Sequence, residues 1–192
     1  LAQCWAQLRK RHRQDAPRFA VISYGKLGGK ELGYASDLDI IFIYDDDHAD
    51  AAEVYARLAQ RLNNWLTSLT SSGQLFETDL RLRPSGASGL LVSSIEAFTR
   101  YQNEQAWVWE HQALTRARFS AGDARVGNQF EETRVQVLRP PREINALRRE
   151  VVGMTLSQAA GDHQLAARER RLDVGHLQNG VDALGLAVLN KC

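Results

Sequence analysis

Cysteine is scarce in this chain, and long hydrophobic runs are missing from it. The two cysteines, Cys4 and Cys192, stand near opposite ends, so they provide neither a disulfide framework nor a CxxC metal motif. No segment is long and apolar enough to cross a bilayer, and we expect no signal peptide. These absences predict a protein of the reducing cytoplasm that has no membrane partner.

The chain also has no large excess of positive or negative charge. The 24 lysines and arginines nearly balance the 23 acidic residues, and the net charge of +1 disfavours a nucleic-acid partner. Hydrophobic residues make up 44% of the 192 positions, which is enough for one domain with a buried core. Leu1 opens the sequence and Met154 is its one methionine, so we expect a piece of a longer protein.

Two apolar, β-branched segments predict strands at residues 18–25 and 38–44. Helical spacing of apolar residues predicts a helix over 1–13 and another over 51–70, with Gly73 at the C-terminal end of the second. A mixed α/β domain follows, in which helices cover a small sheet.

Strict alternation predicts a third strand at residues 75–84, ended by Pro84. The expected buried face carries Phe76, Thr78, Leu80 and Leu82, and the expected charged face carries Glu77, Asp79, Arg81 and Arg83. Residues 93–122 predict one or two helices, and another helix is expected over about 141–152. We therefore expect a core domain over 1–122, a helical extension over 123–154 and a weakly ordered tail over 155–192.

Two aspartates open the second predicted strand. Asp37 and Asp39 stand two residues apart, so they point to one face about 6.6 Å apart, where they repel each other unless a cation lies between them. If the third strand lies beside the second, Asp79 joins them. Three carboxylates without histidine or cysteine suit Mg²⁺ or Mn²⁺ rather than zinc, and paired ions of this kind support in-line attack on phosphorus.

A glycine-rich turn supplies candidate phosphate contacts. Its glycines allow close approach of the backbone to a ligand and can direct amides at phosphate oxygens. The turn matches neither the P-loop nor the GxGxxG pattern. Gly33 is also one of the glycines of the turn, and the candidate nucleotide-binding residues are Gly25, Lys26, Gly28, Gly29, Lys30, Ser36, Arg81 and Arg83. Glu77 is a candidate extra metal ligand, with a plain surface charge as the alternative.

Each of these features alone also has a purely structural explanation: a turn, a solubilising strand end or a solvated strand face. Together they form a coherent phosphoryl-transfer site. Trp107, Trp109 and Phe98 are expected in the core, and His111 is expected to pack or to form a hydrogen bond rather than act as a base.

Three segments carry a family resemblance. "YGKLGGKELGYASDLDIIFIYD", "ETDLRLRPSGASGLLVSS" and "WEHQALTRAR" resemble the bifunctional glutamine synthetase adenylyltransferase/adenylyl-removing enzymes, which belong to the polymerase-β-like nucleotidyltransferases. The resemblance covers about residues 1–154, and we expect it to end near Met154, where either a shifted reading frame or a divergent lineage begins. The segments "ELGYASDLD", "RLRPSG" and "WEHQA" look like the C-terminal, adenylylating copy of this domain.

The resemblance implies a polymerase-β-like fold and a reaction. ATP would bind with Mg²⁺ on Asp37 and Asp39, a tyrosine hydroxyl of glutamine synthetase would attack the α-phosphorus, and pyrophosphate would leave. Asp79 would complete the metal site and is a candidate to help deprotonate the tyrosine. A P-II-type signalling protein and glutamine would regulate the full enzyme, which lowers glutamine synthetase activity when nitrogen is plentiful.

Three alternatives stay open at this point. The domain could be the copy that removes AMP by phosphorolysis. It could be an inactive fragment that only binds a nucleotide or a partner. It could also be a nucleotidyltransferase that acts on RNA or on a small molecule.

Overall fold

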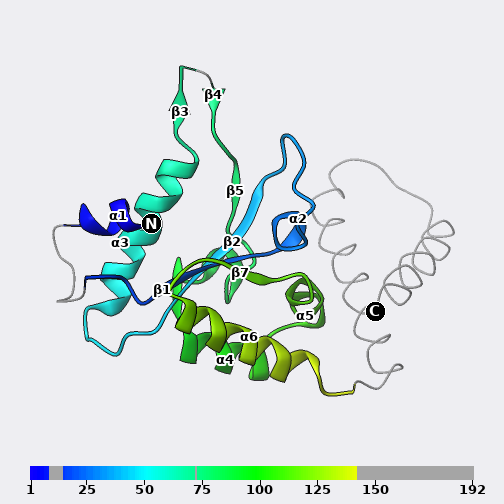
Figure 1. The fold of residues 1–192 in the computed structure, drawn as a ribbon. Coiled ribbons are helices and arrows are strands. Elements are labelled where there is room, and N and C mark those ends of the chain that lie inside the picture. The colour runs from blue at the N-terminus through cyan, green and yellow to red at the C-terminus, as the bar shows by residue number, and fades with distance from the viewer. Residues whose placement is uncertain (9–14, 72, 142–192) are drawn as a thin grey trace, which may run out of the picture. The chain divides into compact units, whose positions relative to one another are not determined.

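The computed structural model describes residues 1–8, 15–71 and 73–141 (Figure 1). Residues Leu1–Pro140 form one compact unit. The helix expected at 141–152 and the tail expected at 155–192 lie outside the described residues. Among the described helices, none combines the length and the apolar character needed to cross a membrane.

A mixed five-stranded sheet forms the centre of this unit, as expected for the fold class. Its strands are β1 (Phe19–Ser23), β2 (Leu38–Tyr44), β5 (Thr78–Asp79), β6 (Val92–Ser94) and β7 (Arg118–Gly122). The order is β5-β2-β1-β7, and β6 also pairs with β2. The pairs β1–β2 and β1–β7 are antiparallel, whereas β5 and β6 both run parallel to β2.

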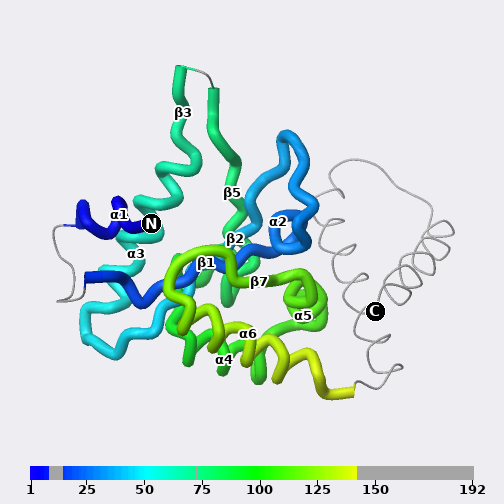
Figure 2. Tube along the Cα trace, in the orientation of Figure 1, coloured from blue at the N-terminus to red at the C-terminus, as the bar shows by residue number. Residues whose placement is uncertain are grey.

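Helices cover both faces of the sheet. All five residues of β1 are buried, because alternate side chains point into two separate hydrophobic clusters. Phe19 and Val21 face α1 (Ala2–Ala6) and α3 (Ala51–Leu66), which lie side by side (Figure 2). Ala20 and Ile22 share the second cluster with residues of three further helices. These are α4 (Ile95–Glu104), α5 (Val108–Leu114) and α6 (Ala124–Leu138).

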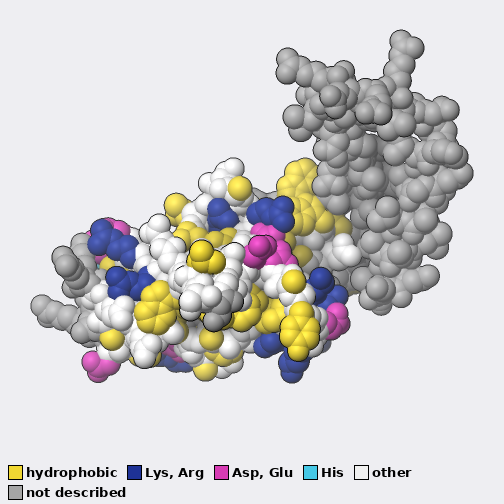
Figure 3. All heavy atoms as spheres, turned by 90° about the horizontal axis from the view of Figure 1, so that it is seen from above, with side chains coloured by type: hydrophobic (Ala, Val, Ile, Leu, Met, Phe, Trp, Pro, Cys, Tyr) yellow, Lys and Arg dark blue, Asp and Glu magenta, His cyan; other side chains and the backbone are white. Residues whose placement is uncertain are grey.

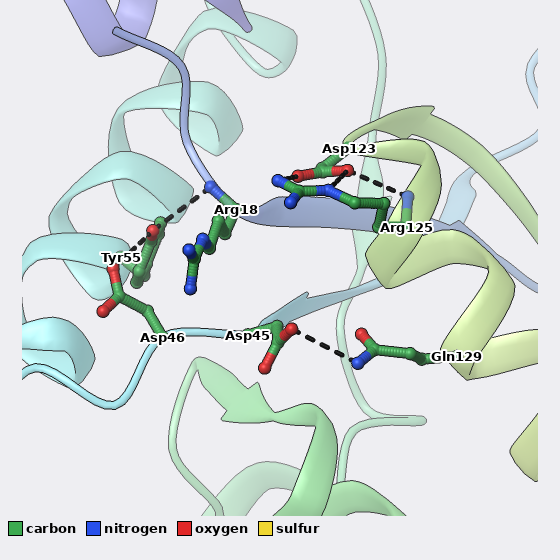
Figure 4. A network of polar contacts seen from close by, with 7 residues as sticks. All are labelled: Arg18, Asp45, Asp46, Tyr55, Asp123, Arg125 and Gln129. Atoms are coloured by element: carbon green, nitrogen blue, oxygen red, sulfur yellow. Dashed lines mark hydrogen bonds and ion pairs between the residues drawn. The ribbon is translucent and has the colours of Figure 1, made fainter. Parts of the chain in front are cut away.

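A polar network joins the start of β1 to the end of β2. The hydroxyl of Tyr55, on α3, accepts a hydrogen bond from the backbone amide of Arg18 at 3.2 Å and donates one to Asp46 at 3.0 Å (Figure 4). Asp45 accepts a hydrogen bond from Gln129 on α6. Helices on opposite faces are thus both tied to the turn that follows β2.

The helix predicted at 51–70 ends earlier than expected, at Leu66. The hydroxyls of Thr67 and Ser68 donate to the carbonyls of Asn63 and Asn64, and such side chains compete with the helical backbone. Residues 69–74 then form a hairpin of β3 (Leu69–Thr70) and β4 (Gly73–Gln74). The prediction of Gly73 as a helix-ending glycine is therefore wrong, since it lies in the hairpin with φ +107°.

The strand predicted at 75–84 is reduced to Thr78–Asp79. The carboxylate of Asp79 accepts the backbone amide of Arg81 at 2.8 Å, and this contact turns the chain immediately after the strand. Leu80 packs against the first cluster and Leu82 against the second, so the two leucines do not share one face. The expected alternation fails beyond Asp79.

Residues 93–122 contain two helices, as expected, but end in the strand β7, which the helical prediction missed. A one-turn 3-10 helix, η1 (Gly86–Ser88), lies in the loop after β5. Phe98 is fully buried, as predicted, and the ring of His111 hydrogen-bonds to the carbonyl of Gln102. Trp107 and Trp109 are 64% and 38% exposed, so their placement in the core was wrong.

Candidate active site

Three carboxylates gather where β5 pairs with β2. The parallel register sets Asp39 beside Asp79, and Asp37 directly precedes β2. Each of the three residues offers one oxygen, and these oxygens lie within 4.8 Å of one another. The convergence expected from the sequence is therefore present. Glu77 lies outside this group and is exposed, although its carbonyl accepts the amide of Leu38.

The electrostatics of the group are asymmetric. Partial burial, with the negative charges of Asp37 and Asp79, raises the pKa of Asp39 above its ordinary value. Hydrogen bonds from Arg81 lower the pKa of Asp79. Figure 3, a view of the molecule from above, shows acidic side chains next to lysine or arginine side chains on the face that is seen. Arg81 thus compensates the negative charge most strongly at Asp79, which it hydrogen-bonds, and the charges of Arg81 and Lys26 offset only part of the rise at Asp39.

Gly25 lies directly against Asp39. A Cβ at position 25 would come within 2.1 Å of the Asp39 Oδ2 atom, and the φ of +51° there also favours glycine. The neighbouring amide of Tyr24 donates to the carbonyl of Asp39 at 2.8 Å. The first residue of the glycine-rich segment therefore forms a wall of the carboxylate site.

The rest of the predicted turn begins as a short helix, α2 (Gly25–Gly28). The amides of Gly28 and Gly29 donate to the carbonyls of Tyr24 and Gly25, so these two amides do not form the expected phosphate cradle. Gly28 is needed for packing, because a Cβ there would meet backbone atoms, whereas Gly29 lies against the end of a flexible side chain. A Cβ at Gly28 would lie 2.1 Å from the carbonyl oxygen of Arg116, and one at Gly29 would lie 2.5 Å from its guanidinium.

Two arginines near the start of β7, which were not among the site residues predicted from the sequence, contact the glycine-rich segment: Arg118 holds α2, and Arg116 bonds a residue beyond its end. Arg118 donates to the carbonyls of Gly28 and Leu27 at 2.9 and 3.1 Å. Arg116 donates to Glu31 at 2.6 Å. Both arginines belong to the segment "WEHQALTRAR", which the sequence analysis singled out. Their contacts with the glycine-rich segment could not be predicted, because the two segments lie far apart along the chain.

The guanidinium of Arg83, which was expected to contact phosphate, instead binds backbone carbonyls. It donates to the carbonyls of Leu80, Ala87 and Gly89 at 2.6, 3.1 and 3.3 Å. These bonds close the loop that follows β5. Arg83 is thus engaged with the backbone in this structure, whereas Arg81 is exposed and lies on Asp79.

The segment between α2 and β2 contains two residues in the left-handed region, Lys30 (φ 60°) and Ala35 (φ 59°). Non-glycine residues adopt this conformation infrequently, and it is enriched at ligand sites. Lys26 and Lys30 are exposed, and Ser36, next to Asp37, is half-buried. Lys26 is close enough for its charge to offset part of the rise in the pKa of Asp39, and Ser36 directly precedes Asp37 in the segment that leads into β2.

An open pocket of about 720 Å³ adjoins the group. One wall is residues 32–36 and the other is residues 74–77, which are the segments leading into β2 and β5. Its apolar lining includes Leu32, Leu75 and Phe76, all partly or well exposed, and Tyr34 beside them is fully exposed. Among the described residues that line the pocket, Glu77 is the charged one.

The donor set fits a hard divalent cation. Three carboxylate oxygens at this spacing, without histidine or cysteine in the group, match the preference of Mg²⁺ and Mn²⁺ for oxygen ligands. The raised pKa of Asp39 and the arginine on Asp79 both indicate that the group favours a neighbouring positive charge.

A small mixed sheet, covered by helices and carrying an acidic triad where two parallel strands pair, is the architecture of a polymerase-β-like nucleotidyltransferase. The sequence model of the family described as "GlnE: Glutamate-ammonia ligase adenylyltransferase" matches residues 1–133. The chain belongs to this family.

Curated relatives carry the name "Bifunctional glutamine synthetase adenylyltransferase/adenylyl-removing enzyme". The protein of Nitrosomonas europaea is 64% identical over 154 residues, which are 80% of this chain and 16% of the relative. The protein of Aromatoleum aromaticum is 60% identical over 177 residues, 92% of this chain and 18% of the relative. That of Burkholderia pseudomallei is 55% identical over 190 residues, 96% of this chain and 20% of the relative.

The chain thus spans about a fifth of the length of these relatives. An alignment over 96% of a 192-residue chain must continue well past Met154. The prediction that the resemblance ends near Met154 is therefore wrong for this relative, and the 92% coverage leads to the same conclusion for the protein of Aromatoleum aromaticum.

Proposed function

We propose that this domain transfers AMP from ATP to a tyrosine hydroxyl of glutamine synthetase, as the adenylylating half of a cytoplasmic enzyme that regulates nitrogen assimilation. The observation that carries the proposal is the group of Asp37, Asp39 and Asp79, in a chain of the glutamate-ammonia ligase adenylyltransferase family. In the full-length enzyme, a P-II-type protein and glutamine would adjust the activity.

The three carboxylates would hold Mg²⁺, with Mn²⁺ as a substitute. When bound, the metal would neutralise the phosphates of ATP and favour departure of pyrophosphate. Asp39, whose pKa is raised, gains most from a cation, because partial burial and two neighbouring carboxylates disfavour its charge. Asp79 is the candidate to accept the proton of the attacking tyrosine.

Basic residues at the edge of the triad are the candidate phosphate contacts. Lys26, Lys30 and Arg81 are exposed and carry the positive charge that a triphosphate needs, and Ser36 can donate its hydroxyl. Gly25 admits the substrate close to Asp39 because it has no Cβ. Gly28, Gly29 and Arg83 would act through the shape of the backbone, since their described contacts are internal.

The pocket beside the triad suits the acceptor better than the nucleotide. Among its described lining residues there is no lysine or arginine, and its apolar side chains favour an uncharged aromatic segment. One wall ends at Ser36, next to Asp37, and the other ends at Glu77, two residues before Asp79, so a tyrosine bound there would lie near the carboxylates. This placement supports a protein acceptor over RNA.

The decisive experiment incubates the chain with labelled ATP, Mg²⁺ and unmodified glutamine synthetase. We expect label on the target protein and release of pyrophosphate. In a parallel reaction with phosphate and AMP-modified target, we expect little ADP. Efficient ADP formation would instead assign the domain to the phosphorolytic copy, and loss of both reactions would favour a binding fragment. An Asp39→Asn variant serves as the inactive control.

A further inference from the structure

The helix α2 is too short to be stable by itself. It is a single turn, in which the amides of Gly28 and Gly29 donate to the carbonyls of Tyr24 and Gly25 at 2.7 and 3.0 Å. Isolated helices of this length do not persist in water, so contacts from outside must set its position. Its first residue, Gly25, lies against the carboxylate of Asp39. Any displacement of α2 therefore moves a wall of the triad.

The other end of α2 is bound by a side chain of β7. Nε of Arg118 donates to the carbonyl of Gly28 at 2.9 Å, and Nη2 donates to the carbonyl of Leu27 at 3.1 Å. Carbonyls at the end of a helix need partners from outside, and the planar guanidinium offers two donors in a fixed arrangement. Arg118 is half-buried, so water weakens these bonds less than it would on an open surface.

The strand β7 contains one residue more than its pairing with β1 needs. Val21 pairs with Ala121, but the next residue, Ile22, pairs with Phe119. Ser120 is therefore the extra residue of a β-bulge. Because side chains alternate between the two faces of a strand, one extra residue reverses the face to which each preceding residue of β7 points.

The bulge directs Phe119 and Arg118 to opposite sides. The ring of Phe119 packs against the second hydrophobic cluster, where a Cβ on Gly127 of α6 would lie 2.5 Å from it. Arg118, which pairs with Ser23, points away from α6 and reaches α2. Without the extra residue, Phe119 would pair with Ser23 and would face α2 in place of the arginine.

We propose that Arg118 is a positioning residue for the active site: through α2 it holds Gly25 and Lys26 in place beside Asp39. Burial and the neighbouring carboxylates raise the pKa of Asp39, and the charge of Lys26 offsets part of this rise. Displacement of α2 would thus move both a wall and a cation away from the triad. The catalytic part of this inference rests on the proposed function, whereas the attachment of α2 does not.

Three variants separate this role from that of charge and from general stability. Arg118→Ala removes both bonds to α2. Arg118→Lys keeps the positive charge but has a single nitrogen in place of the planar fork. Arg61→Ala is the matched control, because Arg61 on α3 also donates to a backbone carbonyl of another segment, that of Gln7, and belongs neither to the triad nor to the pocket lining.

Three quantities are measured on the whole chain, well below the melting temperature of each variant. We expect Arg118→Ala to speed amide hydrogen exchange in peptides covering 24–31, to weaken Mn²⁺ binding in calorimetry about tenfold and to lower kcat for AMP transfer about tenfold or more. Arg118→Lys should change the same quantities in the same direction, to a smaller extent, and it decides the question if Arg118→Ala does not fold. Arg61→Ala should leave all three at the values of the parent.

Parental exchange rates at 24–31 in the folded Arg118 variants would overturn the attachment of α2. Full activity of Arg118→Lys, with a raised KM for ATP as the one change in Arg118→Ala, would make Arg118 a charge near the nucleotide and overturn the positioning role. Faster exchange with unchanged Mn²⁺ affinity and kcat would overturn the effect on the triad. A parent chain that neither transfers AMP nor binds Mn²⁺ would contradict the proposed function, and the exchange comparison would still decide whether Arg118 holds α2.

Discussion

Arg81 donates both its backbone amide and its guanidinium to the carboxylate of Asp79: the amide nitrogen lies 2.8 Å from Oδ1 and Nε lies 2.9 Å from Oδ2. The side chain of Asp79 therefore ends the strand and also forms an ion pair with the guanidinium of Arg81, two residues later. The guanidinium lies where a positive charge is favoured, next to carboxylates that would hold a metal. Asp79 links the fold of this segment to its chemistry.

This contact predicts that Arg81→Ala separates metal binding from catalysis. Removal of a neighbouring positive charge should leave Mn²⁺ affinity at least as high as in the parent, because the guanidinium competes for the same carboxylate. AMP transfer should fall about 10- to 100-fold if Arg81 stabilises charge on the phosphates. Calorimetry without nucleotide and a transfer assay measure the two quantities.

Leu80→Ala is the comparison variant for Arg81→Ala. Leu80 is half-buried against the first hydrophobic cluster, so truncation should cost about 1–2 kcal/mol of unfolding free energy, below the range for fully buried leucines. Its transfer rate at low temperature should stay near that of the parent. A Leu80→Ala variant that folds normally but cannot transfer AMP would contradict this assignment of roles.

Asp37→Asn and Asp39→Asn should each abolish AMP transfer and leave the fold intact, since each removes one charge from the proposed metal ligands. Glu132→Gln is the matched control, because Glu132 is an exposed carboxylate on α6 that belongs neither to the triad nor to the lining of the pocket. We expect this control to retain activity. Near-parental transfer by either aspartate variant would rule out the three-carboxylate metal site. Circular dichroism would verify that all three variants fold.

The opposite pKa shifts of Asp39 and Asp79 predict opposite effects on stability in metal-free buffer. The pKa of Asp39 is raised by folding, so its ionised form opposes the fold above that pKa, and Asp39→Asn should melt at or above the parent at neutral pH. The pKa of Asp79 is lowered, so its stabilising effect exists above its ordinary pKa and is lost as pH falls through the folded value. Asp79→Asn should therefore melt below the parent at neutral pH.

Thermal melts between neutral and acidic pH would test this pair of shifts. Both differences should shrink in acid, where the parent carboxylates are protonated as well. Saturating Mg²⁺ should raise the melting temperature of the parent above that of Asp39→Asn, since the variant lacks the ligand. Two variants that shift the melting temperature in the same direction at neutral pH would contradict the asymmetry.

Gly25→Ala should damage the site more than Gly33→Ala. The added methyl group at position 25 would overlap the Asp39 carboxylate, and the positive φ adds at least about 1 kcal/mol of strain. At Gly33, the nearest atom to an added Cβ is the hydroxyl oxygen of Ser36, at 3.7 Å, which is an ordinary contact. We expect Mn²⁺ binding to be lost in the first variant and retained in the second, with calorimetry as the measurement.

The triad could be predicted from the sequence because its geometry follows from two simple rules. The spacing of Asp37 and Asp39 sets both on one face, and the apolar run after them marks a central strand with which β5 can pair. The wrong extent of the third strand has an equally local cause. The alternation of residues 75–84 does not indicate that the side chain of Asp79 accepts a hydrogen bond from the backbone amide of Arg81, which ends the strand.

Contacts that are distant along the chain could not be predicted in this way. Arg83 follows Asp79 by four residues, so simple alternation puts both side chains on one face of a strand. The carbonyls that Arg83 binds come within its reach only when the loop closes. Arg118 holds carbonyls at Leu27 and Gly28, and only the pairing of β7 with β1 brings it there. β7 itself was hidden because Arg118–Gly122 contains one large apolar residue, Phe119.

The parallel pairing of β5 with β2 also sets the order in which a newly made chain can assemble its site. Antiparallel β1 and β2 meet through a local connection, so Gly25, Asp37 and Asp39 come together early. Asp79 can join them only after α3 has formed the crossover that brings β5 back beside β2. The cation binding proposed for the triad would thus be a property of the finished crossover, and a nascent chain that ends before β5 contains only two of the three proposed ligands.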